Sequence, residues 1–191
     1  MPDLALVVFS GGVAAWVTGE AALSAIDRPA PGTLALPTGL LVLTGQLGGV
    51  IEHVLGGHSP GWAIAAGGGL LLAGISLRWW SIAALGPAFA TALDSARLVT
   101  SGPYRWMRHP SEAGLAAAMI GSGVLLVSRL ALLAAAAAVP IAVVRCWRED
   151  VALARRHRTA HAAWATRVGW LWRRGSIRGG ARPASSTDGA T

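Results

Sequence analysis

Long windows almost without charge constrain this chain more than any other feature of its sequence. Several stretches of about 18 residues or more consist of apolar side chains with hardly an acidic or basic residue among them. A water-soluble helix or strand would instead alternate apolar and polar positions at its own period. Only 13% of the residues are charged, against roughly 25% in soluble domains. We therefore expect an all-α, polytopic membrane protein.

The apolar windows predict about five transmembrane helices followed by a cytosolic helix. The expected spans are Leu4 to Ile26, Leu34 to Leu55, Trp62 to Leu85, Ala113 to Ser128, and Leu130 to Trp147. The fourth is short for a bilayer and would need tilt or local thinning. Only Ser128 and Arg129 separate the last two spans, so these should form a tight hairpin. The segment from Arg148 to about Arg167, rich in Ala, Leu and Arg, predicts the cytosolic helix.

One membrane domain over residues 1–174 and a polar, disordered tail over 175–191 are expected from the composition. Gly45, Gly49 and the run at 67–69 are interpreted as places where helices approach closely, although flexible filler in a Gly-rich chain explains them equally well. The single cysteine, Cys146, excludes an internal disulfide. The N-terminus lacks the basic region of a signal peptide, so the first span should remain as an anchor.

The net charge of +7 comes from arginines that lie beside the apolar spans. It does not form a basic arm with interleaved aromatics, so nucleic acid is not an expected partner. Most of these arginines fall on one face of the five-span arrangement, with Arg129 as the exception, and the positive-inside tendency makes that face cytoplasmic. The N-terminus is then outside and the C-terminus cytoplasmic. The Arg-only, Ala- and Gly-rich composition favours a bacterial inner membrane, with membrane lipids as neighbours; the oligomeric state is undetermined.

The segment Leu98 to Gly114, between the third and fourth spans, concentrates polar side chains on the face assigned to the cytoplasm. Pro110 suits the first position of a helix, because its missing N–H would be unpaired there, and this makes His109 the expected N-cap. The free amides of that helix start, with Arg105 and Arg108 beside them, suit a carboxylate or phosphate. The helix dipole and the two arginines predict that His109 is neutral near pH 7.

This segment and a second one resemble the isoprenylcysteine carboxyl methyltransferase-like and phospholipid methyltransferase-like membrane enzymes. The first carries Gly102-Pro103-Tyr104-Arg105, then Arg108-His109-Pro110 and Gly114, after a similar stretch from Leu77 to Leu93. The second carries paired acids and spaced polar and aromatic residues: Glu149, Asp150, Leu153, His157, His161 and Trp164. The resemblance covers a family-like core over residues 77–171.

The resemblance implies an enzyme that uses S-adenosylmethionine and methylates a lipophilic small molecule or lipid. On this basis Arg108 and the amides near Pro110 hold the cofactor's carboxylate, and Glu149 and Asp150 accept from its ribose hydroxyls or amine. The residues so assigned to the cofactor are Tyr104, Arg105, Arg108, His109, Pro110, Glu149, Asp150 and His161. Those assigned to the chemical step are Arg108 and His109, together with Glu112, at which the chain departs from the family's pattern.

Several of these assignments have a plainer alternative. Glu112 stands where many relatives carry Tyr; it is either a base for a hydroxyl or amine acceptor or a capping-box acid that bonds back to the His109 N–H. Glu149 and Asp150 could instead be solvated helix charges paired with neighbouring arginines. His157 and His161 have the i, i+4 spacing of metal ligands, but no third ligand is nearby, so no metal is expected.

Two further choices stay open. Glu20, and Glu52 with His53, lie inside or near the ends of apolar spans and either serve function or join helices by hydrogen bonds. A non-enzymatic membrane transporter or scaffold of the same fold is the alternative to an enzyme. Within the enzyme class, carboxyl, hydroxyl and amine acceptors remain, with a small lipophilic acceptor favoured.

Overall fold

The computed structural model describes residues 3–24, 35–86 and 98–169, and it confirms the all-α prediction for them. The elements are α1 Leu4–Ser24, α2 Ala35–Gly56, α3 Gly61–Leu85, the short 3₁₀ helix η2 Gly102–Arg105, α4 Pro110–Leu125 and α5 Arg129–Ala165. The predicted tail at 175–191 lies outside the described residues, as does Arg28, which the topology prediction used.

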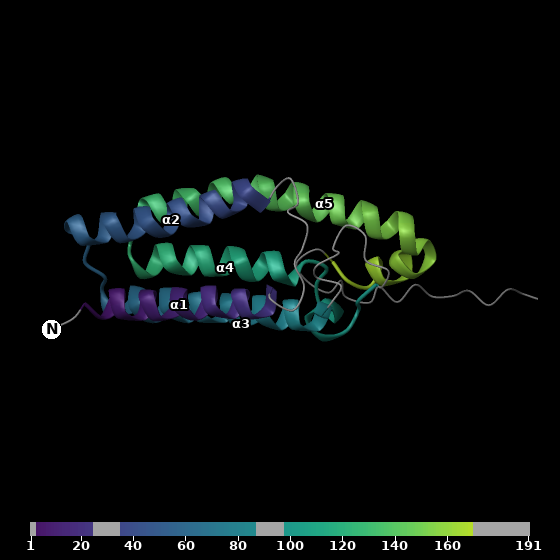
Figure 1. Cartoon of the computed structure of the whole chain (residues 1–191), viewed down its shortest axis with the longest axis horizontal. Helices are drawn as coiled ribbons and strands as arrows, with labels where there is room; N and C mark the ends of the chain where they lie inside the picture. Colours follow the sequence, from purple (N-terminus) through teal and green to yellow (C-terminus); the bar gives the residue numbers. More distant parts are fainter. Residues whose placement is uncertain (1–2, 25–34, 87–97, 170–191) are drawn as a thin grey trace, which may run out of the picture.

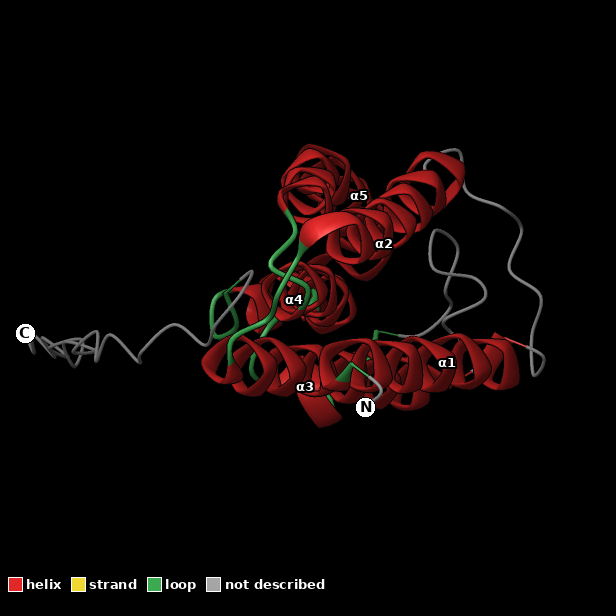
Figure 2. Cartoon of the chain, turned by 90° about the vertical axis from the view of Figure 1, so that its left-hand side faces the viewer, coloured by secondary structure: helices red, strands yellow, loops and turns green. Residues whose placement is uncertain are grey.

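The helices α1 to α5 lie lengthwise beside one another and alternate in direction (Figure 1). Seen from the end, α1 and α3 form one layer, α2 and α5 form another, and α4 lies between them (Figure 2). The turns at 57–60 and 126–128 therefore lie at one end of the bundle. At the other end lie η2, the start of α4 and the C-terminal part of α5, which we call the polar end.

Four of these helices are long and apolar enough to cross a membrane: Leu4–Ala22, Leu36–Gly56, Gly61–Leu85 and Arg129–Ala165. They match the first, second, third and fifth expected spans. The helix α4, which corresponds to the fourth, has only 16 residues, or about 24 Å at 1.5 Å per residue. That is less than the roughly 30 Å of a hydrocarbon core. Because α3, α2 and α5 all contact it, α4 is largely enclosed by protein.

The fifth expected span and the expected cytosolic helix are continuous in α5. A single helix of 37 residues runs from Arg129 to Ala165, because Arg, Glu, Asp, Ala and Leu after Trp147 include strong helix formers and neither Gly nor Pro. The helical path is interrupted instead at Arg158, with φ 30° and ψ −98°. This bend turns the last residues of α5 back toward η2 (Figure 1).

Close packing of α3 on α4 depends on glycines spaced seven apart on both helices: Gly67 and Gly74 on α3, Gly114 and Gly121 on α4. A Cβ on Gly74 would lie 2.5 Å from the Ala118 backbone nitrogen and 2.7 Å from the Gly114 carbonyl oxygen. Backbone atoms cannot yield as a flexible side chain can, so these positions admit only glycine.

The close-approach interpretation of the other predicted glycines is confirmed for some and wrong for one. A Cβ on Gly45 would lie 2.8 Å from Ala134 Cβ, and one on Gly49 would lie 3.2 Å from Ala131 Cβ, so both help α2 to approach α5. Gly69, in contrast, faces open space. Only part of the glycine run at 67–69 therefore contributes to helix packing.

Glu52 and His53 join helices at the end of the bundle opposite the polar end. Glu52 Oε2 accepts hydrogen bonds from Ser128 Oγ at 2.7 Å and from the Leu130 amide at 3.0 Å, next to the start of α5. His53 is buried, with Nδ1 3.1 Å from the Leu126 carbonyl oxygen and Nε2 3.0 Å from Asp3 Oδ2. Of the two sequence interpretations, helix joining is the one these contacts support.

Candidate active site

The polar end begins with the turn that leads into α4. Gly102 has φ +59°, a left-handed conformation that favours glycine, and it starts the η2 helix. His109 is the N-cap of α4 and Pro110 its first residue, as predicted. The His109 side chain makes no capping hydrogen bond, so it does not occupy the amides at the start of α4.

Side chains from the two sequence segments meet around Asp150 of α5. Arg108 Nη1 donates to Asp150 Oδ2 at 2.7 Å. His109 Nε2 lies 3.3 Å from Asp150 Oδ1, and His161 Nε2 lies 3.8 Å from the same oxygen. Glu149 Oε2 is 3.6 Å from His109 Nδ1. We call this set, Arg108, His109, Glu149, Asp150 and His161, the Asp150 cluster.

Most of the Asp150 cluster is removed from solvent. His109, Asp150 and His161 are buried, and the Arg108 side chain is only 12% exposed. Asp150 is therefore not the solvated helix charge of the plainer interpretation, whereas the Glu149 side chain is 32% exposed. Arginine and histidine from the segment before α4 face them across the helix interface.

Burial opposes the charged form of His109, but contacts with Asp150, Cys146 and Glu149 outweigh it and raise its pKa to about 11. The prediction that His109 is neutral was therefore wrong. It counted the helix dipole, Arg105 and Arg108, and it lacked the two carboxylates that α5 brings to the ring. An imidazolium with a carboxylate near each ring nitrogen is stabilised by their charge and is not a free base.

Asp150 Oδ1 and His161 Nε2 are among the buried polar atoms of the cluster that make no hydrogen bond within residues 3–24, 35–86 and 98–169. Buried polar atoms in folded proteins are nearly always hydrogen-bonded, to protein, water or ligand. The pair thus offers an acceptor and a ring nitrogen to a ligand at the polar end.

Residues 67–155 of the chain match the family model described as the isoprenylcysteine carboxyl methyltransferase (ICMT) family. The chain is similar to this family over that stretch. The family is one of membrane methyltransferases, which agrees with the chain's apolar helices. The matched residues include Arg108, His109, Glu149 and Asp150 and end before His161. No curated protein and no solved structure matches the chain.

Arg105 and Tyr104, which the resemblance assigned to the cofactor, lie outside the Asp150 cluster. Arg105 is exposed, and its guanidinium lies 4.3 Å from the Trp106 ring centroid. Tyr104 is buried in an apolar group with Trp164 and Val168. Burial, reinforced by the charge of Glu149, raises the pKa of Tyr104, so its hydroxyl stays protonated.

Tyr104 instead helps to hold the folded-back end of the chain in place. Trp164 Nε1 donates to the Tyr104 carbonyl oxygen at 3.1 Å. The Arg108 amide donates to the Gly169 carbonyl oxygen, also at 3.1 Å. These contacts keep residues that follow the Arg158 bend, including His161, against the start of α4.

Glu112, in the first turn of α4, faces α5. Its Oε1 lies 3.0 Å from Arg145 Nη2, so an arginine of α5 holds the carboxylate. Its Oε2 is buried and makes no hydrogen bond among the described residues. Arg145 precedes Glu149 by one helical turn, so this pair neighbours the Asp150 cluster.

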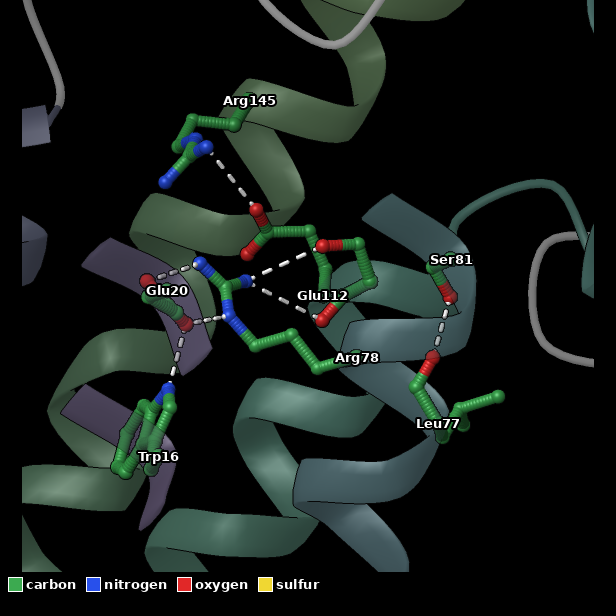
Figure 3. A network of polar contacts seen from close by, with 8 residues as sticks. Trp16, Glu20, Leu77, Arg78, Ser81, Glu112 and Arg145 are labelled. Atoms are coloured by element: carbon green, nitrogen blue, oxygen red, sulfur yellow. Dashed lines mark hydrogen bonds and ion pairs between the residues drawn. The ribbon is translucent and has the colours of Figure 1, made fainter. Parts of the chain in front are cut away.

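A second polar group that sequence reasoning missed centres on Arg78 of α3 (Figure 3). Its guanidinium pairs with Glu20 of α1 through Nε and Nη2, and Nη1 donates to Ser111 Oγ at 3.1 Å. Trp16 Nε1 also donates to Glu20. A lone arginine in one apolar span and a lone acid in another was the signal that could have identified this pair.

His157 and His161 do not share one helical face, because the bend at Arg158 lies between them. Within the described ranges, no three His, Cys, Asp or Glu side chains gather as metal ligands. His161 belongs to the Asp150 cluster, and His157 is not among its members.

Proposed function

We propose that this chain transfers a methyl group from S-adenosylmethionine to a lipophilic acceptor at the cytoplasmic face of the membrane. The family match supports methyltransferase chemistry. The observation that carries the assignment of the site is the buried Asp150 cluster, in which an acidic oxygen and an imidazole nitrogen lack hydrogen-bond partners.

The residues at the polar end fit the chemical groups of this cofactor, which supplies a methyl group on a positively charged sulfur. Asp150 Oδ1 can accept from ribose hydroxyls or from the cofactor amine, and both acids of the cluster favour its positive charge. Arg108 and the amides at the start of α4, which the His109 side chain does not cap, suit its carboxylate.

His109 acts in this proposal as a positioning residue. Its ring lies between Asp150 and Glu149 and, as an imidazolium, attracts both carboxylates electrostatically. This fixes the direction of each carboxylate and offsets the repulsion between neighbouring acids. Because methyl transfer is a direct displacement, rate acceleration comes mainly from holding the two reactants in line with water excluded.

The cluster lies where a water-soluble cofactor and a membrane-bound acceptor can meet. Asp150 follows Arg129 by 21 residues in α5, or about 31 Å at 1.5 Å per residue, close to the thickness of a hydrocarbon core. Exposed Trp80 on α3 and Trp147 on α5 have the residue type that prefers the membrane–water boundary. We therefore put the cluster at that boundary, with the acceptor on its lipid side.

Binding of S-adenosylhomocysteine to detergent-purified protein, measured by calorimetry, tests the proposal. We expect saturable binding that Asp150→Asn weakens about ten-fold or more, since a hydrogen bond to a charged group contributes about 1.5–3 kcal/mol. Asp3→Asn is the matched control, because Asp3 contacts His53 at the opposite end of the bundle. Absence of binding to the folded wild-type protein would return the chain to the non-enzymatic alternative.

A further inference from the structure

The residues on the membrane side of the Asp150 cluster allow the class of acceptor to be inferred. We propose that the acceptor is an amphiphile whose nucleophilic atom carries a hydrogen, a hydroxyl or an amine, and that Glu112 accepts this hydrogen as a proton. This inference rests on the proposed function, but it concerns the acceptor and not the cofactor.

Helix register puts Glu112 and Arg145 deeper in the bundle than the cluster. Glu112 follows His109 by three residues along α4, which runs from the polar end into the bundle. Arg145 precedes Glu149 by four residues along α5, which runs toward the polar end. Both steps lead the same way, by about 5 to 6 Å at 1.5 Å per residue. An acceptor anchored in lipid therefore reaches the level of Glu112 and Arg145, and a cofactor that binds from water reaches the Asp150 cluster.

The two oxygens of the Glu112 carboxylate differ in their contacts. Its side chain is 13% exposed, and Oε1 is paired with Arg145. Oε2 is buried and receives no hydrogen bond from the described residues. The nearby Arg78 directs Nε and Nη2 to Glu20 and Nη1 to Ser111 (Figure 3). A buried carboxylate oxygen without a donor is costly, so a ligand that brings an O–H or N–H to it gains affinity.

The same oxygen disfavours a carboxylate acceptor. Two carboxylates in a site of low dielectric constant repel each other, and a carboxylate has no hydrogen to donate to Oε2. A hydroxyl or amine has the required hydrogen. Of the acceptor classes that the sequence left open, the charge of Glu112 therefore favours a hydroxyl or an amine over a carboxylate.

The transfer balances with Glu112 in this role. The acceptor oxygen or nitrogen forms a bond to the methyl carbon, and the carbon–sulfur bond breaks with its electron pair going to sulfur. The sulfonium becomes the neutral thioether of S-adenosylhomocysteine. The hydrogen leaves the acceptor as a proton and binds Glu112 Oε2, from which it passes to water after product release.

The test compares amphiphiles that share one alkyl chain and differ in headgroup: a phenol, a primary amine and a carboxylate. Binding of each is measured by calorimetry with S-adenosylhomocysteine saturating, and methyl transfer is measured with tritium-labelled S-adenosylmethionine. We expect the phenol, the amine or both to bind at least ten-fold more tightly than the carboxylate, and methylation to follow this order. The difference between phenol and amine identifies which donor the site takes.

Glu112→Gln is the diagnostic variant, because the amide keeps the shape and cannot take the proton. It should abolish the headgroup preference in binding and lower turnover at least 100-fold, while S-adenosylhomocysteine affinity stays within three-fold of wild type. Glu52→Gln, at the opposite end of the bundle, is the matched control. Equal binding of all headgroups, a preference for carboxylate, or full turnover in Glu112→Gln each overturns the inference. Failure of S-adenosylhomocysteine to bind wild type refutes the proposed function instead.

Discussion

Arg108 Nη1 donates to Asp150 Oδ2 at 2.7 Å and thereby joins the turn before α4 to α5. Both side chains are nearly buried, at 12% and 11% exposure. Arg108→Ala leaves Asp150 with only imidazole partners, and we expect it to lower the free energy of unfolding by about 1.5–3 kcal/mol. Arg105→Ala, which removes an exposed arginine, should change it by about 0.5–1 kcal/mol at most. Unfolding midpoints in detergent check this, and equal shifts would contradict it.

Stability should depend on the protonation of His109, which faces Glu149 and Asp150 of α5 and neighbours Arg108. Its folded-state pKa of about 11 lies above the ordinary value of 6.5, so the folded protein binds a proton that the unfolded chain releases. The stabilisation is complete below about pH 6.5, declines above it and is lost as the pH passes 11. The unfolding midpoint should therefore fall between pH 7 and 10 more steeply in wild type than in His109→Gln. Parallel pH profiles would argue against a protonated ring.

The Glu20–Arg78 pair should be strongly coupled, because it connects α1 to α3 inside apolar spans. Removing one partner leaves a buried charge, so Arg78→Met should cost about 3–5 kcal/mol. The double variant Glu20→Gln with Arg78→Met leaves no charge and should recover much of that loss. A double-mutant cycle of unfolding midpoints measures the coupling. Additive effects would mean that the two side chains act independently.

Substitutions at two glycines of α3 should affect stability differently, because only one of them lies against α4. Gly74→Ala puts a Cβ 2.5 Å from the Ala118 nitrogen, and we expect it to force the helices apart at a cost of about 1–3 kcal/mol. Gly69→Ala meets no atom within 4 Å and should be neutral or stabilising by up to about 1 kcal/mol, because alanine favours helix. Thermal unfolding of the two variants decides. Similar behaviour would show that the contact tolerates expansion.

Cysteine labelling in intact cells tests orientation. Ser101 and Thr166 are exposed at the polar end, and His58 is exposed at the turn between α2 and α3. Ser101→Cys and Thr166→Cys should resist an impermeant maleimide and react after permeabilisation, whereas His58→Cys should react at once. Native Cys146 is buried and gives little background. The reverse pattern would place the polar end outside.

The sequence predicted the helices well where a local signal exists. Apolar length set the ranges of α1, α2 and α3, and Pro110 set the start of α4. The bend at Arg158 could not be predicted, since an arginine in an Ala- and Arg-rich segment has good helix propensity. Docking of Trp164 on the Tyr104 carbonyl accompanies the unusual backbone there, and this contact spans 60 residues. Tertiary contacts of that range leave no local pattern.

For the candidate site, the sequence identified residue types and order but not partners. Arg108, His109 and Asp150 were named, yet their pairing and the resulting charge of His109 depend on how α4 lies against α5. Arg105 was grouped with them by proximity along the chain, although η2 turns its side chain toward Trp106. The Glu20–Arg78 pair was not predicted, because each residue lies alone in its apolar span and the contact between the two helices brings them together.

The bend at Arg158 has a consequence for biosynthesis. His161, Trp164 and the Gly169 carbonyl, all made after the bend, contribute to or support the Asp150 cluster. All membrane helices are therefore synthesised, and can enter the translocon, before the polar end is complete. A polypeptide truncated after Arg158 should still insert into the membrane but should be inactive. Synthesis of the residues after Arg158 would then determine when the protein becomes active.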